Sequence, residues 1–198
     1  PGHAQTGVAG AVVDKLTQKP VPGATIQYRL DDPNTATRTD EAGRFVLTGL
    51  QPSTHCFVYV MAKGYVSQRT IPRVVKDRIT ENPPIELDPG SRVQGIVADP
   101  DGKPIAGATV QTFFFTNLPV ITGEDGRFEI DGVNPVADSH ILQATHPDYP
   151  AVSVNFKPAA VGETVYQDLV LKPGADILGR VTDPDGRPVE GVQVGNTR

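Results

Sequence analysis

An internal repeat constrains this chain more than any other feature. Residues 102–110 (GKPIAGATV) recur 84 residues later at 186–194 as GRPVEGVQV, and residues 19–26 (KPVPGATI) are an earlier copy at the same spacing. A second landmark, GRF at 43–45, returns 83 residues later at 126–128. A unit of about 84 residues is long enough to bury a core of its own. The repeat therefore predicts small tandem domains rather than one large domain.

Two Pro-Gly pairs mark the expected boundaries between copies. Pro89-Gly90 and Pro173-Gly174 stand at equivalent places in successive copies. We therefore predict a first module over residues 1–89, a second over 90–173 and the start of an incomplete third over 174–198. This last segment holds only two expected strands, too few to close a sandwich core. Two interpretations stay open for it: truncation of a longer array, or completion of the third module by another chain.

Within each copy, apolar residues recur with the period of two that is typical of a β-strand with one buried face. Val8, Gly10 and Val12 share one face, and residues 93–97 and 177–181 repeat the pattern. Further strands are expected over residues 24–30, 44–47, 55–62, 65–71 and 84–87. The 20 glycines and 19 prolines supply the turns between short strands. This pattern predicts an all-β fold of β-sandwich modules.

The motifs of the repeat resemble those of the carboxypeptidase regulatory-like domains. They are Val-x-Gly-x-Val-x-Asp, Gly-Lys/Arg-Pro-x-x-Gly-Ala/Val-x-Val, TDEAGRF at 39–45 and AKGY at 62–65. The second module keeps the third motif at 122–128, with Gly123 where the first has Asp40, and replaces the fourth by ATHPDY at 144–149. The resemblance covers nearly the whole chain.

This resemblance implies a seven-stranded Greek-key sandwich of the prealbumin (transthyretin) type, similar also to the B-type repeats of collagen-binding adhesins. Such modules are usually non-catalytic accessories of secreted or surface enzymes, receptors and adhesins. The resemblance therefore implies a secreted, periplasmic or cell-surface location. The motifs specify strand ends and turns, and a fold of this kind does not by itself define a function.

Charge and composition argue against several classes of function. The net charge is −5 and the 18 basic residues are scattered, so we expect no nucleic-acid partner. No apolar run approaches the roughly 20 residues of a membrane-spanning helix, so we expect no membrane insertion. The familiar nucleophile elbow, phosphate loop, dinucleotide fingerprint and His-Glu-x-x-His motif are missing from the sequence. We therefore expect no enzyme activity, no catalytic residues and no cofactor.

Paired aspartates in two turns are the main candidates for a metal site. Asp99 and Asp101 are echoed by Asp183 and Asp185, and carboxylates on a tight loop can bind calcium. The loop lacks the remaining ligands, because the twelfth position from Asp99 is Val110 rather than glutamate. A hairpin turn is therefore the better interpretation, and no metal is expected.

The histidines and the single cysteine give no metal-binding pattern either. His3, His55, His140 and His146 show none of the spacings typical of zinc sites. Cys56 shares its strand face with valines, which predicts a buried thiol rather than a nucleophile.

Outward-facing aromatic side chains are the candidate interaction surface. Strand alternation puts Phe113 and Phe115 on the outer face of one strand, and Phe57 and Tyr59 on the outer face of another. The resembling family would place such strands side by side, and exposed apolar patches often mark contacts. The alternatives are packing between neighbouring modules, or a bulge that turns one phenylalanine inward.

Taken with the repeat, these features predict a non-catalytic tandem scaffold or interaction module of a larger secreted or cell-surface protein. Its partner would be another protein or the neighbouring modules of the same polypeptide. One alternative is a carbohydrate-binding accessory module of an extracellular enzyme, with the aromatic rings as stacking platforms. Another is a regulatory appendage that contacts a protease.

Overall fold

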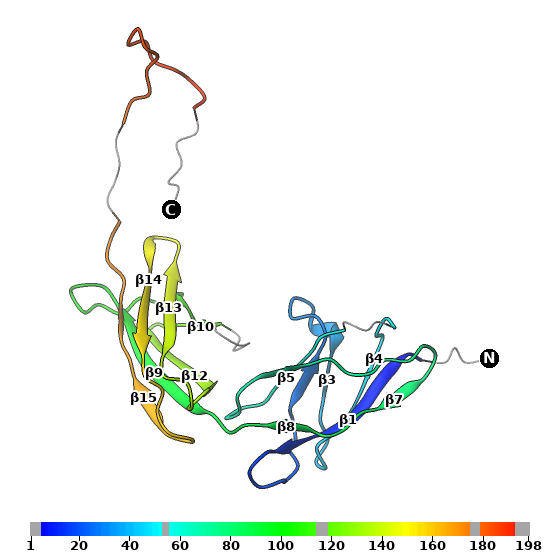
Figure 1. Cartoon of the computed structure of the whole chain (residues 1–198). Coiled ribbons are helices and arrows are strands. Elements are labelled where there is room, and N and C mark those ends of the chain that lie inside the picture. The colour runs from blue at the N-terminus through cyan, green and yellow to red at the C-terminus, as the bar shows by residue number, and fades with distance from the viewer. Residues whose placement is uncertain (1–4, 53–55, 114–118, 175–178, 193–198) are drawn as a thin grey trace.

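The computed structural model describes residues 5–52, 56–113, 119–174 and 179–192 (Figure 1). In these ranges the chain forms two all-β modules, followed by a short hairpin-like segment. Their only helical element is the 3₁₀ turn η1 (Pro33–Thr35). The predicted all-β fold and its tandem organisation are confirmed.

Module 1 is a sandwich of two sheets. Its strands are β1 (Gly7–Asp14), β2 (Thr25–Gln27), β3 (Ala36–Arg38), β4 (Arg44–Thr48), β5 (Val58–Met61), β6 (Gln68–Thr70), β7 (Ile79–Glu81) and β8 (Ile85–Leu87). One sheet has the order β4-β1-β7, with β8 also paired to β1, and the other has the order β3-β2-β5-β6. β7 and β8 pair in parallel with successive lengths of β1. They occupy one strand position, so the predicted seven positions are present.

Module 2 repeats this architecture. Its strands are β9 (Ser91–Ala98), β10 (Thr109–Phe113), β11 (Val120–Ile121), β12 (Arg127–Val133), β13 (His140–His146), β14 (Tyr149–Phe156), β15 (Thr164–Tyr166) and β16 (Leu169–Val170). The sheets are β12-β9-β15, with β16 also paired to β9, and β11-β10-β13-β14. Each strand of module 1 therefore has a counterpart in module 2.

Each module has its own hydrophobic core between its two sheets. The core of module 1 includes Val8, Val12, Ile26, Val58, Val60 and Leu87. The core of module 2 includes Val93, Val97, Val110, Leu142, Leu169 and Leu171. Alternation in the strands produces this burial, as the period of two predicted.

A buried threonine ties the first hairpin of each module to the following strand. Thr39 Oγ1 accepts a hydrogen bond from the Ala24 amide at 2.8 Å and donates one to the Val21 carbonyl at 2.7 Å. In module 2, Thr122 Oγ1 makes the equivalent bonds, to the Ala108 amide at 2.9 Å and the Ile105 carbonyl at 2.8 Å. The threonine of the TDEAGRF motif thus satisfies buried backbone groups in both modules.

The strand expected over residues 24–30 is shorter than predicted. It ends at Gln27, whose side chain is buried, whereas Leu30 is 41% exposed. In a strand over residues 24–30, alternation from Ile26 predicts that Gln27 faces solvent and Leu30 faces the core, and both of these predictions are wrong. Gln27 is buried because its side-chain amide is hydrogen-bonded to the backbone of the loop that follows.

The third copy reproduces the first hairpin of a module. Thr182 and Pro188 form a β-bridge, as Val13 and Pro20 do in module 1. The Val189 amide donates to the Val181 carbonyl at 3.0 Å, and both side chains are at least 40% exposed. Figure 1 shows this segment beyond the second module. The domain boundaries after residues 89 and 173 remain predictions, as do both interpretations of this segment.

Candidate functional site

The outer face of the β3-β2-β5-β6 sheet carries the aromatic side chains predicted as an interaction surface in module 1. Phe57 is 38% exposed, and the guanidinium carbon of Arg69 lies 4.5 Å from the centre of its ring. Tyr59 is half-buried and lies opposite Arg69 in the β5–β6 register. A guanidinium over an aromatic face is a cation–π contact, which stabilises the position of both side chains. No pattern in the sequence indicated that Arg69 would lie over Phe57.

The equivalent face of module 2 carries amides and hydroxyls instead of arginine. Gln111 Nε2 donates to Gln143 Oε1 at 3.1 Å, and Gln143 Nε2 donates to Ser153 Oγ at 3.3 Å. Phe113 lies at the end of β10 and is 41% exposed. Phe115 lies outside the described residues. The two faces therefore occupy equivalent sheets but offer different chemistry.

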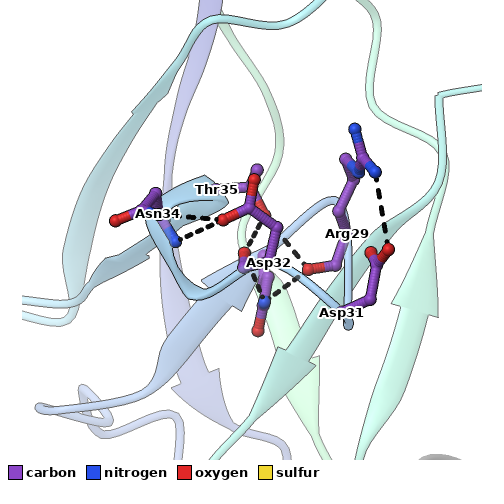
Figure 2. Close-up of polar contacts among 6 residues, drawn as sticks. Arg29, Asp31, Asp32, Asn34 and Thr35 are labelled. Carbon is purple, nitrogen blue, oxygen red and sulfur yellow. Dashed lines mark hydrogen bonds and ion pairs between the residues drawn. The ribbon is translucent and has the colours of Figure 1, made fainter.

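The loop after β2 is held by hydrogen bonds among its own side chains and backbone (Figure 2). Gln27 Nε2 donates to the carbonyl oxygens of Arg29 and Asp32, and Thr35 Oγ1 donates to the same two oxygens. Asp32 Oδ1 accepts from the Asn34 amide at 3.0 Å and so caps η1. These bonds explain why Gln27 is buried. The two carbonyl oxygens already accept protein hydrogen bonds.

The paired aspartates form hairpin turns. Asp99 Oδ1 accepts from the backbone amides of Asp101 and Lys103, at 3.0 and 2.9 Å. Asp183 Oδ1 makes the equivalent contacts with Asp185 and Arg187. Each first carboxylate therefore stabilises its own turn. Among the described residues, no group of three or more His, Cys, Asp or Glu side chains is placed to hold a metal ion.

Asp14 stands at the same turn in module 1 and has a longer-range partner. Its Oδ1 accepts from the amides of Leu16 and Thr17, and its Oδ2 accepts from the Tyr65 hydroxyl at 3.0 Å. The Thr17 amide is the largest cause of the lowered pKa of Asp14, and the Tyr65 hydroxyl adds to it. Burial is the main cause of the raised pKa of Tyr65.

The remaining candidates lie apart from one another. His140 Nε2 is 2.8 Å from the Asn134 carbonyl oxygen, and His146 packs edge-on against Tyr149. Cys56 is half-buried beside the core of module 1, and burial raises the pKa of its thiol. A thiol with a raised pKa is a poor nucleophile near neutral pH. His3 and His55 lie outside the described residues.

The junction between the modules is short and hydrogen-bonded on both sides. The Gly90 amide donates to the Gly64 carbonyl at 2.8 Å, and the Gly90 carbonyl accepts from Gly162 at 2.9 Å. Gly132 packs so closely on module 1 that a Cβ there would lie 2.1 Å from the Tyr65 carbonyl oxygen. Figure 1 shows β8 leading into β9 through this short connection.

A family model of the carboxypeptidase regulatory-like domain matches this chain twice, over residues 7–87 and 92–172. The chain belongs to this family. Each match covers the strands of one module, so the two modules are tandem carboxypeptidase regulatory-like domains. The resemblance inferred from the repeated motifs is confirmed.

Solved structures similar to these regulatory-like domains include pilins. The Bacillus anthracis TIE protein is 14% identical, with 86% of this chain and 34% of that chain covered and a TM-score of 0.34. A Streptococcal ancillary pilin is 14% identical, with coverages of 89% and 64% and a TM-score of 0.32. The shaft pilin SpaA of Lactobacillus rhamnosus GG is 10% identical, with coverages of 88% and 100% and a TM-score of 0.36. Likeness at this level gives no information on function.

No curated protein matches the chain in sequence. Within the described ranges, no helix is long and apolar enough to cross a membrane.

Sequence reasoning missed the residues that define the junction of the two regulatory-like domains. Gly132 recurs 83 residues after Gly49, and both have positive φ, of 72° and 80°. Their recurrence could have signalled a left-handed turn. The packing of Gly132 against Tyr65 had no sequence signal, because it depends on how one module meets the other.

Proposed function

We propose that this chain is a non-catalytic scaffold and spacer segment of a larger secreted or cell-surface protein. The observation that carries the proposal is the junction, where Gly90 is hydrogen-bonded to Gly64 of one module and Gly162 of the next. The close packing of Gly132 on Tyr65, which leaves no room for a side chain, adds a second contact between the modules. Domains joined by a small interface are expected to move relative to each other, and we propose that these backbone contacts around one short connection restrict that motion.

A spacer of this type acts by geometry. If the two regulatory-like domains keep a fixed relative orientation, the segments joined to their two ends are held at a set distance. A flexible linker does not set such a distance. The third copy repeats the first hairpin, so a further module would extend the same array. The partner in this proposal is a protein, or the neighbouring modules of the same polypeptide.

The relation between the modules can be measured by electron-spin distance spectroscopy. Leu16 and Val136 are 70% and 86% exposed, one in each module, so Leu16→Cys and Val136→Cys give label sites in a Cys56→Ser background. We expect one narrow distance distribution. The matched control has five Gly/Ser residues inserted between Pro89 and Gly90 and should give a broad distribution. If the uninterrupted chain is as broad as this control, the chain is not a spacer.

Carbohydrate binding is a second candidate, favoured by the outer sheet face of module 1. Phe57 under Arg69, with Tyr59 beside them, presents flat rings and guanidinium donors of the kind that bind sugars. A glycan array with the intact chain tests this candidate. Binding that is lost in Phe57→Ala and Tyr59→Ala would support it over both the spacer and a regulatory appendage that contacts a protease. If the chain is instead a regulatory appendage, no glycan on the array should bind. A protease should then bind the chain, and Phe57→Ala and Tyr59→Ala should weaken that binding.

A further inference from the structure

The edge of module 1 formed by β6 carries polar residues where module 2 carries apolar ones. The β5–β6 register places Gln68 and Thr70 opposite buried valines, so both lie on the inward side of β6, where Gln68 is exposed and Thr70 is half-buried at the open edge. The equivalent positions of β14, 84 residues later, are Val152 and Val154, which pack against the core of module 2. Module 1 is therefore missing two apolar side chains at this edge.

The same difference extends along both sheets. Phe156 is buried at the end of β14, whereas the residue 84 positions earlier is Pro72. On the opposite sheet, Thr80 lies opposite Val8, where the equivalent residue of module 2 is Val165 opposite Val93.

Thr80 is independent evidence that the inner face of module 1 lacks contacts near the β6 edge. Its Oγ1 is buried and has no hydrogen-bond partner among the described residues. A buried hydroxyl without a partner is energetically costly, and each such group calls for an explanation. Thr80 shares its sheet face with Val8.

A cavity of about 420 Å³ opens at this edge. Its lining includes Val8, Phe45, Val58, Gln68, Thr70 and Pro72. The first three are core residues and the last three are the edge residues that differ from module 2. An apolar floor with a few polar groups at its rim is the usual character of a binding pocket.

The free side of β6 suggests the kind of occupant. β6 is the last strand in the order β3-β2-β5-β6 and has only three residues, Gln68–Thr70. A strand at a sheet edge has unpaired backbone groups that can pair with an added strand. In module 2, alternate apolar side chains of β14 fill the equivalent space. An extended segment with alternate apolar side chains therefore fits this edge.

Charge around the groove favours an acidic segment. Residues 63–78 contain five basic residues and one acidic residue, Asp77. The basic residues, all exposed, are Lys63, Arg69, Arg73, Lys76 and Arg78. Within the described residues no ion pair engages any of them.

The acidic side chains on the other side of the groove do not cancel this charge. Asp88 forms a salt bridge with Lys15 at 2.8 Å, whereas Glu86 accepts from the uncharged side-chain amide of Gln18 at 3.0 Å and keeps its negative charge. Residues 63–88 together with Lys15 hold six basic and four acidic residues, so the net charge on this side of module 1 is positive, which attracts carboxylates.

We propose that the β6 edge of module 1 is a docking groove for an extended acidic peptide segment of another protein. The segment pairs with the free side of β6 and places alternate apolar side chains in the cavity, while its carboxylates face the basic residues of 63–78. This proposal goes beyond the spacer function and concerns a different surface from the aromatic face.

The probe is a capped peptide with the sequence of residues 151–156 of this chain, carrying Ser153→Asp and Asn155→Asp. It combines the side chains that fill this space in module 2 with two carboxylates. Titrated into the full chain, it should shift the amide resonances of Gln68, Thr70 and Thr80. A control peptide with serine at the two valine positions and the phenylalanine position should produce no such shifts.

The decisive variant fills the groove with the residues of module 2: Gln68→Val, Thr70→Val and Pro72→Phe. Because module 2 holds these side chains in the same frame, the variant should fold, which its melting temperature checks. We expect the dissociation constant of the peptide to rise by about tenfold or more. Arg69→Gln with Arg73→Gln should weaken binding less, and only at low salt. The single variant Thr70→Val serves if the triple variant does not fold.

Several results would overturn the proposal. Unchanged affinity in the filled variant would place the peptide elsewhere. Equal binding of the serine control would mean that charge alone attracts the peptide. Sedimentation showing dimers that the filled variant abolishes would make a second copy of this chain the occupant. None of these results bears on the spacer measurement, which reports the junction.

Discussion

Modules 1 and 2 share a backbone frame but differ in their edges and charge. The buried threonine bonds of Thr39 and Thr122 agree within about 0.1 Å, and Gly43 and Gly126 have φ of 72° and 70°. These residues satisfy or shape the backbone, so no side-chain substitute serves there. Side chains on the edge strands are not needed to satisfy or shape the backbone in this way, and at these positions the two modules differ.

Charge follows the same division. Residues 1–89 contain ten basic and nine acidic residues, whereas residues 90–173 contain five basic and ten acidic residues. Apart from the β6 edge of module 1, both cores are nevertheless built from equivalent strand positions. Surface charge affects what a module attracts rather than how it folds.

The largest expected effect tests whether equivalent glycines have equivalent roles. Gly132→Ala should cost about 3 kcal/mol or more, because it adds a contact with backbone to the strain of a positive φ. Gly49→Ala is the matched control: its φ is 80°, but its nearest neighbour is the Tyr28 hydroxyl at 3.5 Å. It should cost only about 1–2 kcal/mol. Amide hydrogen exchange, resolved by residue, measures both.

Spin-label distances distinguish a damaged junction from a damaged module. Gly132→Ala should broaden the distribution between labels at positions 16 and 136, and Gly49→Ala should leave it narrow. Equal broadening in both variants would mean that the junction does not depend on Gly132.

The second prediction is that equivalent substitutions in the two modules lower stability by the same amount. Thr39→Val and Thr122→Val each remove a buried hydroxyl that accepts from one backbone group and donates to another. Each should lower the stability of its own module by about 1–3 kcal/mol, because both backbone partners lose their bonds. Hydrogen exchange should show the loss in the substituted module only. A loss that spreads across both modules would contradict separate cores.

The repeat and the period of two were enough to predict tandem β-sandwich modules, whereas the seven-stranded Greek-key topology came from the resemblance to the family. Both are local features: Val8, Gly10 and Val12 alternate within one strand, and GRF recurs within one turn. The family match over 7–87 and 92–172 agrees with that prediction. Core residues could be predicted because one buried face imposes its period on the sequence.

The candidate sites could not be predicted to the same degree, because they depend on contacts between distant residues. Gln27 is buried because its amide bonds the carbonyls of Arg29 and Asp32, which no alternation rule detects. The 84-residue spacing pairs Gln68 and Thr70 with Val152 and Val154, but only the strand register shows that these positions lie on the inward side of an edge strand. The roles of Phe57, Tyr59, Phe113 and Phe115 as an interaction surface remain predictions.

The third test uses a contact of module 1. Tyr65→Phe removes the hydroxyl that donates to Asp14, and should cost about 1 kcal/mol at pH 7. The folded-state pKa of Asp14 is lowered, so the stability from ionised Asp14 is present above its unfolded pKa of about 3.9 and lost as pH falls through the lower folded value. The difference between wild type and Tyr65→Phe should therefore shrink in acid. A difference that is constant from pH 7 to pH 2 would contradict this assignment.

The smallest expected effect concerns the turn after the first strand of each module, which is one residue longer in module 1 than in module 2. Gln18 has a φ of 56°, and Gly102, 84 positions later, has a φ of 80°. Glycine adopts positive φ without strain, so Gln18→Gly should stabilise module 1 by about 0.5 kcal/mol after the loss of two exposed side-chain hydrogen bonds. Gly102→Gln, the reverse exchange, should destabilise module 2 by about 1 kcal/mol. Hydrogen exchange in the full chain measures both. If Gln18→Gly is destabilising, the side-chain hydrogen bonds of Gln18 contribute more to stability than its backbone strain costs. This turn, like the edge strands, would then be stabilised differently in the two modules.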